Sequence, residues 1–180
     1  MRIKDNFLDD KYLIQLEELI NNPYFAWYLN EEQTKGADDG RWFSHLIYDK
    51  TGPKELKLPR EISEKTFSCS EFSPLLIKIF NNLNYVDLYR ITINLLLRQK
   101  NQSISAFHTD FEDEIKITTA IFYLNTNNGY TEFENGDKID CIRNRLIMFP
   151  VNTLHRAVGC TDVNKRIVLN FNFLNKFFIN

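Results

Sequence analysis

The sequence has few of the residues that usually mark a disulfide framework or a zinc site. Its 180 residues include only three cysteines and three histidines. Cys69, Cys141 and Cys160 lie far apart and are odd in number, which favours neither paired disulfides nor a zinc knuckle. Because disulfides persist mainly in oxidising compartments, we expect a reducing, cytoplasmic location.

Other common signals are missing as well. No apolar run reaches the length of a transmembrane helix, and the first residues, MRIKDNFLDDKY, lack the apolar stretch of a signal peptide. The formal net charge of −2 offers no basic excess for phosphate contacts, so we expect neither a membrane nor a nucleic-acid partner. The absence of a phosphate loop, a nucleophile elbow and a Cys-x-x-Cys motif argues against kinase, hydrolase and redox functions.

Two segments near the start have the spacing of amphipathic helices. Hydrophobic residues make up 43% of the chain and charged residues 26%, which is typical of a globular protein. Apolar residues recur at helical spacing over 9–22 and again over 70–83. Asp9 or Asp10 is available to cap the first helix, and Pro74 is tolerated in the first turn of the second.

Strand signals dominate from residue 86 onward. The segments 89–97 and 166–173 alternate between apolar and polar residues, and 115–125 is β-branched and aromatic. Shorter strands are predicted for 145–150 and 154–158. An earlier one or two strands, around RWFSHLIYD, precede a long loop rich in turn residues.

This pattern predicts a mainly β fold with flanking helices. Many short strands separated by Gly, Asn and Asp turns favour a double-sheet sandwich or jelly roll. We expect one domain over 1–180, with helical support mainly in 1–85 and the jelly-roll core mainly in 86–175. The helices would pack on the outer face of one sheet. One face of the 89–97 strand carries Ile91, Ile93, Leu95 and Leu97, and the other carries Arg90, Thr92 and Asn94.

The segment His108-Thr109-Asp110 carries the first candidate chemistry. Residues i and i+2 of a strand point to the same side, so His108 and Asp110 would present an imidazole and a carboxylate together. With His155 as a third ligand they would form the two-histidine, one-carboxylate facial triad of non-haem iron(II) oxygenases. The alternative is that these histidines are ordinary surface or core residues, because short motifs often match by chance.

Arg166 strengthens the case for a site. In the strand RIVLNFNF, one face carries Ile167, Leu169, Phe171 and Phe173, and the other face begins with Arg166. If that second face is enclosed, the buried guanidinium needs an anion, and arginine binds a carboxylate with two parallel hydrogen bonds. The alternative is an arginine that points at solvent from an edge strand.

These segments resemble a known enzyme family. HTD, LHRAV and RIVLNFNF are similar to the iron(II)- and 2-oxoglutarate-dependent dioxygenases, and AIFYLN with GYTEFENG resembles their prolyl 4-hydroxylase-like branch. NNGY has one glycine where the family often has two. DNFLDD, FAWYLN and FSHLIYD look like the small bacterial and phage versions, which implies the cytoplasm of a bacterium or of a phage-infected host cell. The resemblance implies a double-stranded β-helix.

Carried over to this chain, the resemblance assigns the main catalytic residues. It implies that His108, Asp110 and His155 bind Fe(2+), and that Arg166 holds the distal carboxylate of the cosubstrate 2-oxoglutarate. With O2, the enzyme would then decarboxylate 2-oxoglutarate to succinate and hydroxylate a C–H bond. A prolyl residue in a peptide or protein is the leading substrate; free amino acids and other small metabolites stay open.

The same resemblance suggests further cosubstrate contacts. Tyr123 would support the same carboxylate through its hydroxyl, or else be a core aromatic. Asn94 and Thr131 lie where the family lines its pocket, although either fits equally as a sheet residue with a local hydrogen bond. Arg90 shares the face of Asn94 and either touches substrate or is solvated. His45 is expected to be a packed histidine.

Two other function classes stay open from the sequence. One is a zinc-dependent hydrolase that uses the same two histidines and carboxylate, which would leave Arg166 and Tyr123 without a role. The other is a non-catalytic jelly-roll binding module, which would not need the triad at all.

Overall fold

The computed structural model describes residues 1–32, 40–50, 70–83, 85–111 and 116–175. The long loop predicted after the RWFSHLIYD strand falls mostly on 51–69, outside the described residues. The described elements follow one another in this order: β1 (Arg2–Lys4), α1 (Asp10–Asn21), β2 (Tyr28–Asn30), β3 (Trp42–Asp49), α3 (Ser73–Ile79), η1 (Asn81–Leu83), β4 (Tyr85–Leu97), β5 (Ile117–Tyr123), β6 (Tyr130–Phe133), β7 (Lys138–Asp140), β8 (Arg145–Pro150), β9 (His155–Val158) and β10 (Lys165–Asn175).

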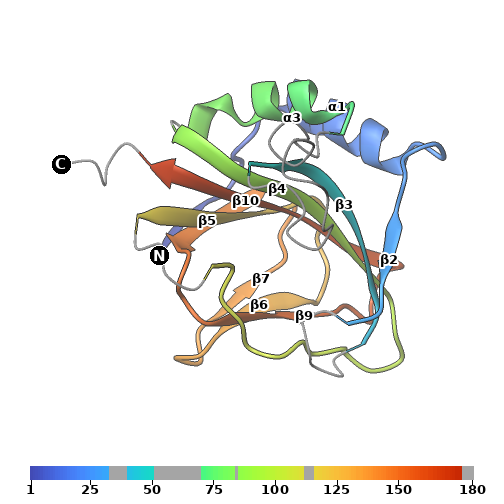
Figure 1. The fold of residues 1–180 in the computed structure, drawn as a ribbon. Coiled ribbons are helices and arrows are strands. Elements are labelled where there is room, and N and C mark those ends of the chain that lie inside the picture. The colour runs from blue at the N-terminus through green and yellow to red at the C-terminus, as the bar shows by residue number, and fades with distance from the viewer. Residues whose placement is uncertain (33–39, 51–69, 84, 112–115, 176–180) are drawn as a thin grey trace, which may run out of the picture.

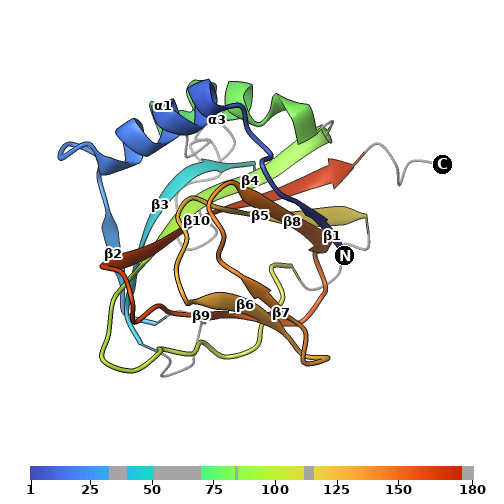
Figure 2. The ribbon, with the colours of Figure 1, turned by 180° about the vertical axis from the view of Figure 1, so that it is seen from behind.

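Two antiparallel sheets face each other. The larger has the strand order β1-β8-β5-β10-β4-β3-β2, and the smaller has the order β7-β6-β9. Figure 1 shows α1 and α3 on one side of the large sheet and the small sheet on the other, and Figure 2 shows the same layers from behind. The predicted mainly β fold, a double-stranded β-helix with helices packed on one sheet, is confirmed.

The helices form where the sequence spacing predicts them. In α1 the buried residues Leu13, Leu16 and Ile20 lie on one face, as expected for an amphipathic helix. Asp9 occupies the N-cap position, but its side chain makes no capping bond; its backbone carbonyl accepts the first helical hydrogen bonds instead. Pro74 lies in the first turn of α3, as predicted.

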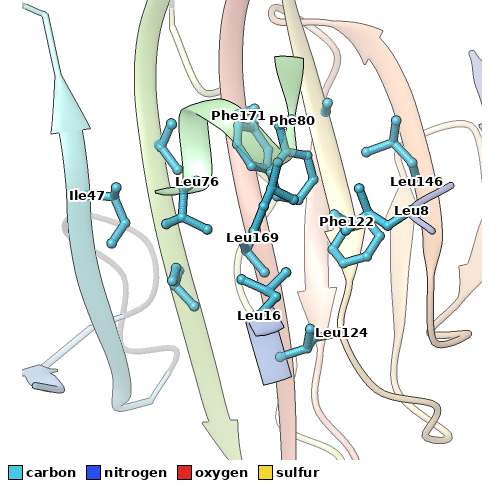
Figure 3. Close-up of a cluster of buried hydrophobic side chains, with 14 of the residues drawn as sticks. Leu8, Leu16, Ile47, Leu76, Phe80, Phe122, Leu124, Leu146, Leu169 and Phe171 are labelled. Carbon is cyan, nitrogen blue, oxygen red and sulfur yellow. The ribbon is translucent and has the colours of Figure 1, made fainter. Parts of the chain in front are cut away.

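The main core lies between the helices and the large sheet. Figure 3 shows Leu16 of α1, Leu76 of α3 and Phe171 of β10 in this cluster. The ring of Phe80, just after α3, lies 4.2 Å from that of Phe171 between centroids. Burial of these apolar side chains holds β4, β5 and β10 flat against the helices and fixes which face of each strand points the other way.

That other face is directed toward the small sheet. In β10, Ile167, Leu169, Phe171 and Phe173 belong to the main core, so the alternate residues face the space between the sheets. β4 behaves similarly, with Ile91, Ile93 and Leu95 in the core. Leu97 was predicted to share that face but is 53% exposed. It is the last residue of β4, two residues beyond Leu95, the last β4 residue of the main core.

Four short strands were not predicted: β6, which contains four residues, and three that are shorter still. β1, β2 and β7 each contain three residues and join sheet edges, where β1 pairs with β8 and β2 pairs with β3. The N-terminal part of the chain, expected mainly as helical support, therefore also contributes β1, β2 and β3 to the large sheet. Among the described residues, no helix is both long and apolar enough to cross a membrane.

Candidate metal centre and adjoining cavity

His108 and His155 face each other across an isolated antiparallel bridge. The backbone N–H of each donates to the carbonyl of the other, both at 3.0 Å, so the two side chains leave the backbone on the same side. The ring centroids are 4.7 Å apart. His155 begins β9, whereas His108 lies in an extended segment rather than in a strand of its own.

Asp110 completes a compact cluster. One ligand atom from each of His108, Asp110 and His155 lies within 4.8 Å of the others, a spacing that suits one metal ion. The side chain of Asp110 is held from behind, because Oδ2 accepts hydrogen bonds from Thr119 Oγ1 at 2.6 Å and from Asn172 Nδ2 at 2.7 Å. Oδ1 is thereby left as the oxygen available to a cation.

The hydrogen bonds of the two histidines also orient them as ligands. Nδ1 of His155 lies 2.9 Å from the Thr153 carbonyl, and Nδ1 of His108 lies 3.2 Å from the Ala106 carbonyl. A carbonyl accepts only from a protonated nitrogen, so the neutral form carries its proton on Nδ1 and leaves the Nε2 lone pair free for a metal.

Burial and charge prepare the same cluster electrostatically. Burial lowers the pKa of His155, against the opposing effect of Asp110, and so favours the neutral imidazole that a metal requires. Burial alone would raise the pKa of Asp110, but His155, Arg90 and the two hydrogen bonds hold it below its usual value. Arg90 lies close by, with one Nη atom 3.7 Å from Asp110 Oδ1 and its Nε donating to Asn172 Oδ1 at 3.1 Å.

A cavity of about 80 Å³ adjoins the two histidines between the sheets. Its walls come from the inward faces of both sheets and from the segment before His108. The lining residues are Trp42, Asn94, Leu96, Ser105, His108, Ile121, Thr131, His155, Arg156, Ala157, Arg166, Val168 and Asn170. Three of the predicted pocket residues, Asn94, Thr131 and Arg166, are therefore brought together with two of the predicted metal ligands.

Arg166 is a buried cation without an acidic partner among the described residues. Only 3% of its surface is exposed. Its Nε donates to Cys141 Sγ at 3.0 Å, and one Nη atom donates to Thr131 Oγ1 at 3.3 Å; both acceptors are neutral groups. A buried guanidinium without a counter-ion is costly, so the cavity is electrostatically suited to an anion.

Tyr123 supports this wall from behind the cavity. It is fully buried, and its hydroxyl donates to Thr131 Oγ1 at 2.8 Å instead of lining the cavity. Thr131 Oγ1 thus accepts from both Tyr123 and Arg166, which uses both lone pairs and leaves its own proton free to donate to a guest. A direct contact between Tyr123 and the cosubstrate stays a prediction.

Gly129, the single glycine of NNGY, leaves room for the arginine. A Cβ atom at this position would lie 2.6 Å from the Val158 carbonyl and 3.0 Å from Arg166 Cδ. The backbone N–H of Gly129 donates to Asn127 Oδ1 at 2.9 Å. One glycine is thus sufficient for the close approach of the hairpin to Arg166.

Two amide side chains in the cavity wall have unsatisfied oxygens. Asn94 Oδ1 and Asn170 Oδ1 are buried and have no hydrogen-bond partner among the described residues. Buried amides that lack partners usually await a ligand or water. These oxygens require a hydrogen-bond donor, whereas Arg166 and Thr131 offer donors to an anion, so the cavity suits a polar guest with both kinds of group.

Some residues of the site were not identified from the sequence. Asn170 and Asn172 follow Arg166 on the inward face of β10, so the alternation of RIVLNFNF was a usable signal. Thr119 and Arg156 gave no such signal, because their roles depend on contacts between distant strands. Arg156 is paired with Glu132 at 2.7 Å.

His45 lies apart from the metal cluster. It is buried among Phe25, Tyr28 and Phe72, and its Nδ1 lies 2.8 Å from the Ala26 carbonyl. It is a packed histidine, as predicted.

No family model and no curated protein matches the sequence. A prolyl hydroxylase from Trichoplax adhaerens, solved with a peptide fragment of the hypoxia inducible factor oxygen degradation domain, has a TM-score of 0.60 at 16% identity, covering 98% of this chain and 84% of that chain. A prolyl-4-hydroxylase from Pseudomonas putida has a TM-score of 0.55 at 13% identity, covering 97% of this chain and 92% of that one.

A third similar structure is that of an enzyme named for a different kind of reaction. It is a non-haem alpha-ketoglutarate-dependent carbocyclase from nogalamycin biosynthesis, with a TM-score of 0.60 at 10% identity, covering 96% of this chain and 78% of that chain. The resemblance predicted from the sequence is thus confirmed at the level of the fold: this chain has the fold of the 2-oxoglutarate and iron(II) oxygenases, prolyl hydroxylases among them.

Proposed function

We propose that this protein is an iron(II)- and 2-oxoglutarate-dependent dioxygenase of the prolyl hydroxylase-like branch, and that it hydroxylates a C–H bond of its substrate. One observation carries the proposal: a two-histidine, one-carboxylate cluster adjoins a cavity that also contains a buried arginine with no acidic partner among the described residues. A metal site alone has many uses. The additional arginine supplies a place for a dicarboxylate beside the metal.

The residues present fit both groups. His108, Asp110 and His155 would hold iron(II), each already oriented by a hydrogen bond on the atom that does not face the metal. Arg166 and the free proton of Thr131 would bind the distal carboxylate of 2-oxoglutarate. When bound, the two groups supply the oxidising chemistry, in which O2 converts 2-oxoglutarate to succinate and CO2 and hydroxylates the substrate.

Asn94 and Asn170 would take part in holding the substrate, whose N–H or O–H groups can donate to their oxygens, or the cosubstrate through their Nδ2 groups. Their amides line the same cavity and each has an unsatisfied oxygen. Ile121 and Val168 of the large sheet and Ala157 of the small sheet give the cavity apolar walls, which would limit the access of water to the reacting atoms and strengthen the contact with Arg166.

For the substrate we propose a prolyl residue in a peptide or protein. The support is that two structures of the same fold are prolyl hydroxylases, one of them solved with a peptide. Because one fold hosts many reactions, as the carbocyclase of the same fold illustrates, other substrate classes should be assayed beside prolyl peptides.

The decisive test is anaerobic addition of iron(II) and 2-oxoglutarate to the metal-free protein. A visible charge-transfer band that needs both additions, and that is absent from the His155→Ala variant, is the expected result. A zinc-dependent hydrolase or a non-catalytic binding module would give no band. If the wild type gives no charge-transfer band, the proposal is refuted.

A further inference from the structure

The proposed function gives no role to a buried thiol beside the arginine. Cys141 follows β7 and is 1% exposed, and its Sγ accepts the hydrogen bond from Arg166 Nε. Burial raises the pKa of this thiol, the guanidinium of Arg166 acting in the opposite direction, so the sulfur is neutral near pH 7. A neutral acceptor holds the arginine without cancelling its charge.

The contacts of Arg166 occupy one edge of its guanidinium. Nε and Nη2 point their N–H bonds along the same edge, and on this edge Nε donates to Cys141 and Nη2 to Thr131. Among the described residues, the other N–H groups have no hydrogen-bond acceptor. The free donors therefore lie at the end of the guanidinium, where Nη1 and Nη2 form the second two-pronged edge.

The two acceptors of Arg166, Thr131 and Cys141, differ in their other hydrogen bonds. Thr131 has a proton of its own for a guest, and it is also held by Tyr123. Cys141 accepts only from Nε, at a shorter distance than Thr131 accepts from Nη2, and the two contacts together restrain the rotation of the planar group. A Cβ atom at position 129 would crowd Arg166 Cδ, so Gly129 leaves room for the aliphatic part of the Arg166 side chain.

We propose that Cys141 is a positioning residue: its neutral thiol fixes the Nε edge of Arg166, so that the end of the guanidinium faces the cavity and binds a carboxylate end-on. The identity of that carboxylate, the distal group of 2-oxoglutarate, rests on the proposed function. The orientation of Arg166 by the thiol does not depend on the proposed function.

The test compares two ligands in the manganese-loaded protein. 2-Oxoglutarate has a distal carboxylate and pyruvate has none, although both offer a 2-oxo acid to the metal. Cys141→Ala should weaken 2-oxoglutarate binding by about tenfold, the effect of one hydrogen bond to a charged group, and leave pyruvate binding unchanged. Cys141→Ser keeps an acceptor and should lie between Cys141→Ala and the wild type.

Cys160→Ala is the matched control. Cys160 is also 1% exposed, but its thiol donates to the Val163 carbonyl at 3.4 Å and makes no hydrogen bond to Arg166. Its removal should leave both affinities unchanged. Equal losses for 2-oxoglutarate and pyruvate in Cys141→Ala, or no loss for either, would overturn the proposal.

A second readout needs neither metal nor cosubstrate. In 15N NMR spectra of the metal-free protein, the Arg166 Nε–H, assigned with Arg166→Lys, should exchange slowly in the wild type and in Cys160→Ala. It should exchange quickly in Cys141→Ala. If the wild type fails to bind 2-oxoglutarate, the proposed function fails, while the NMR result still decides the role of Cys141; an equally protected signal in Cys141→Ala refutes it.

Discussion

Replacing Arg166 with methionine should stabilise the metal-free protein while removing its recognition of 2-oxoglutarate. Arg166 is 3% exposed and is bonded only to a thiol and a hydroxyl among the described residues. Under the proposed function, its charge serves binding at the expense of stability. Methionine fills a similar volume and leaves Thr131 satisfied, since Tyr123 still donates to it.

The magnitude follows from the burial. Exchanging buried ionic groups for apolar ones of similar volume stabilises other proteins by about 1–4 kcal/mol. The two neutral hydrogen bonds of Arg166 offset part of that, so we expect about 2 kcal/mol. In a chain of this length this corresponds to an increase in Tm of about 4–8 °C.

Differential scanning calorimetry of metal-free wild type, Arg166→Met and Arg166→Lys measures the first half of the prediction. Repeating the scans with manganese and 2-oxoglutarate measures the second. At a ligand concentration of about 100 Kd the wild type should gain about 2.7 kcal/mol, and Arg166→Met should gain almost nothing at the same concentration. Arg166→Lys should fall between them, because lysine keeps the charge but loses the paired donors.

Two results would refute this reasoning. A lower Tm for metal-free Arg166→Met would mean that the charge is well satisfied in the folded protein. An undiminished response of Arg166→Met to 2-oxoglutarate would mean that the cosubstrate carboxylate binds elsewhere.

Four further predictions concern single residues and pH. His155→Ala should abolish stoichiometric iron(II) binding with an unchanged circular dichroism spectrum, whereas full iron affinity would contradict the metal assignment. Tyr123→Phe should weaken 2-oxoglutarate binding by about 1 kcal/mol in calorimetric titration, because its hydroxyl acts through Thr131; an unchanged Kd would leave Tyr123 as a core aromatic. Gly129→Ala should destabilise the protein by about 2 kcal/mol in urea denaturation, since the new Cβ would crowd its neighbours, and wild-type stability would show that the hairpin relaxes. The metal-free protein should lose stability as the pH falls below about 6.5, because burial lowers the pKa of folded His155 and the unfolded chain binds the proton more readily. Urea denaturation at pH 7.5 and pH 5.5 checks this, and His155→Gln should show a smaller difference.

The sequence determined the elements whose patterns are long and strongly periodic. The helical spacing of Leu13, Leu16 and Ile20 and the alternation of RIVLNFNF each leave one arrangement that buries the apolar face. The same alternation correctly placed Arg166 on the enclosed face. The spacing of His108 and Asp110 predicted that they would act together.

The tertiary structure decided what depends on contacts between distant segments. Strands β1, β2 and β7 are too short to carry a pattern, and they exist because a longer strand or a neighbouring short strand offers hydrogen bonds at a sheet edge. The exposure of Leu97 depends on how far the main core extends along β4, which alternation cannot report.

The site shows the same division. Residue types and local spacing indicated which side chains could bind a metal and an anion, because those properties belong to each residue and its near neighbours. Only the fold brought Cys141 to Arg166 Nε, placed Tyr123 behind Thr131, and held Asp110 Oδ2 with Thr119 and Asn172. These contacts join side chains from different strands or loops, and hydrogen bonds between such groups leave no periodic signal in the chain.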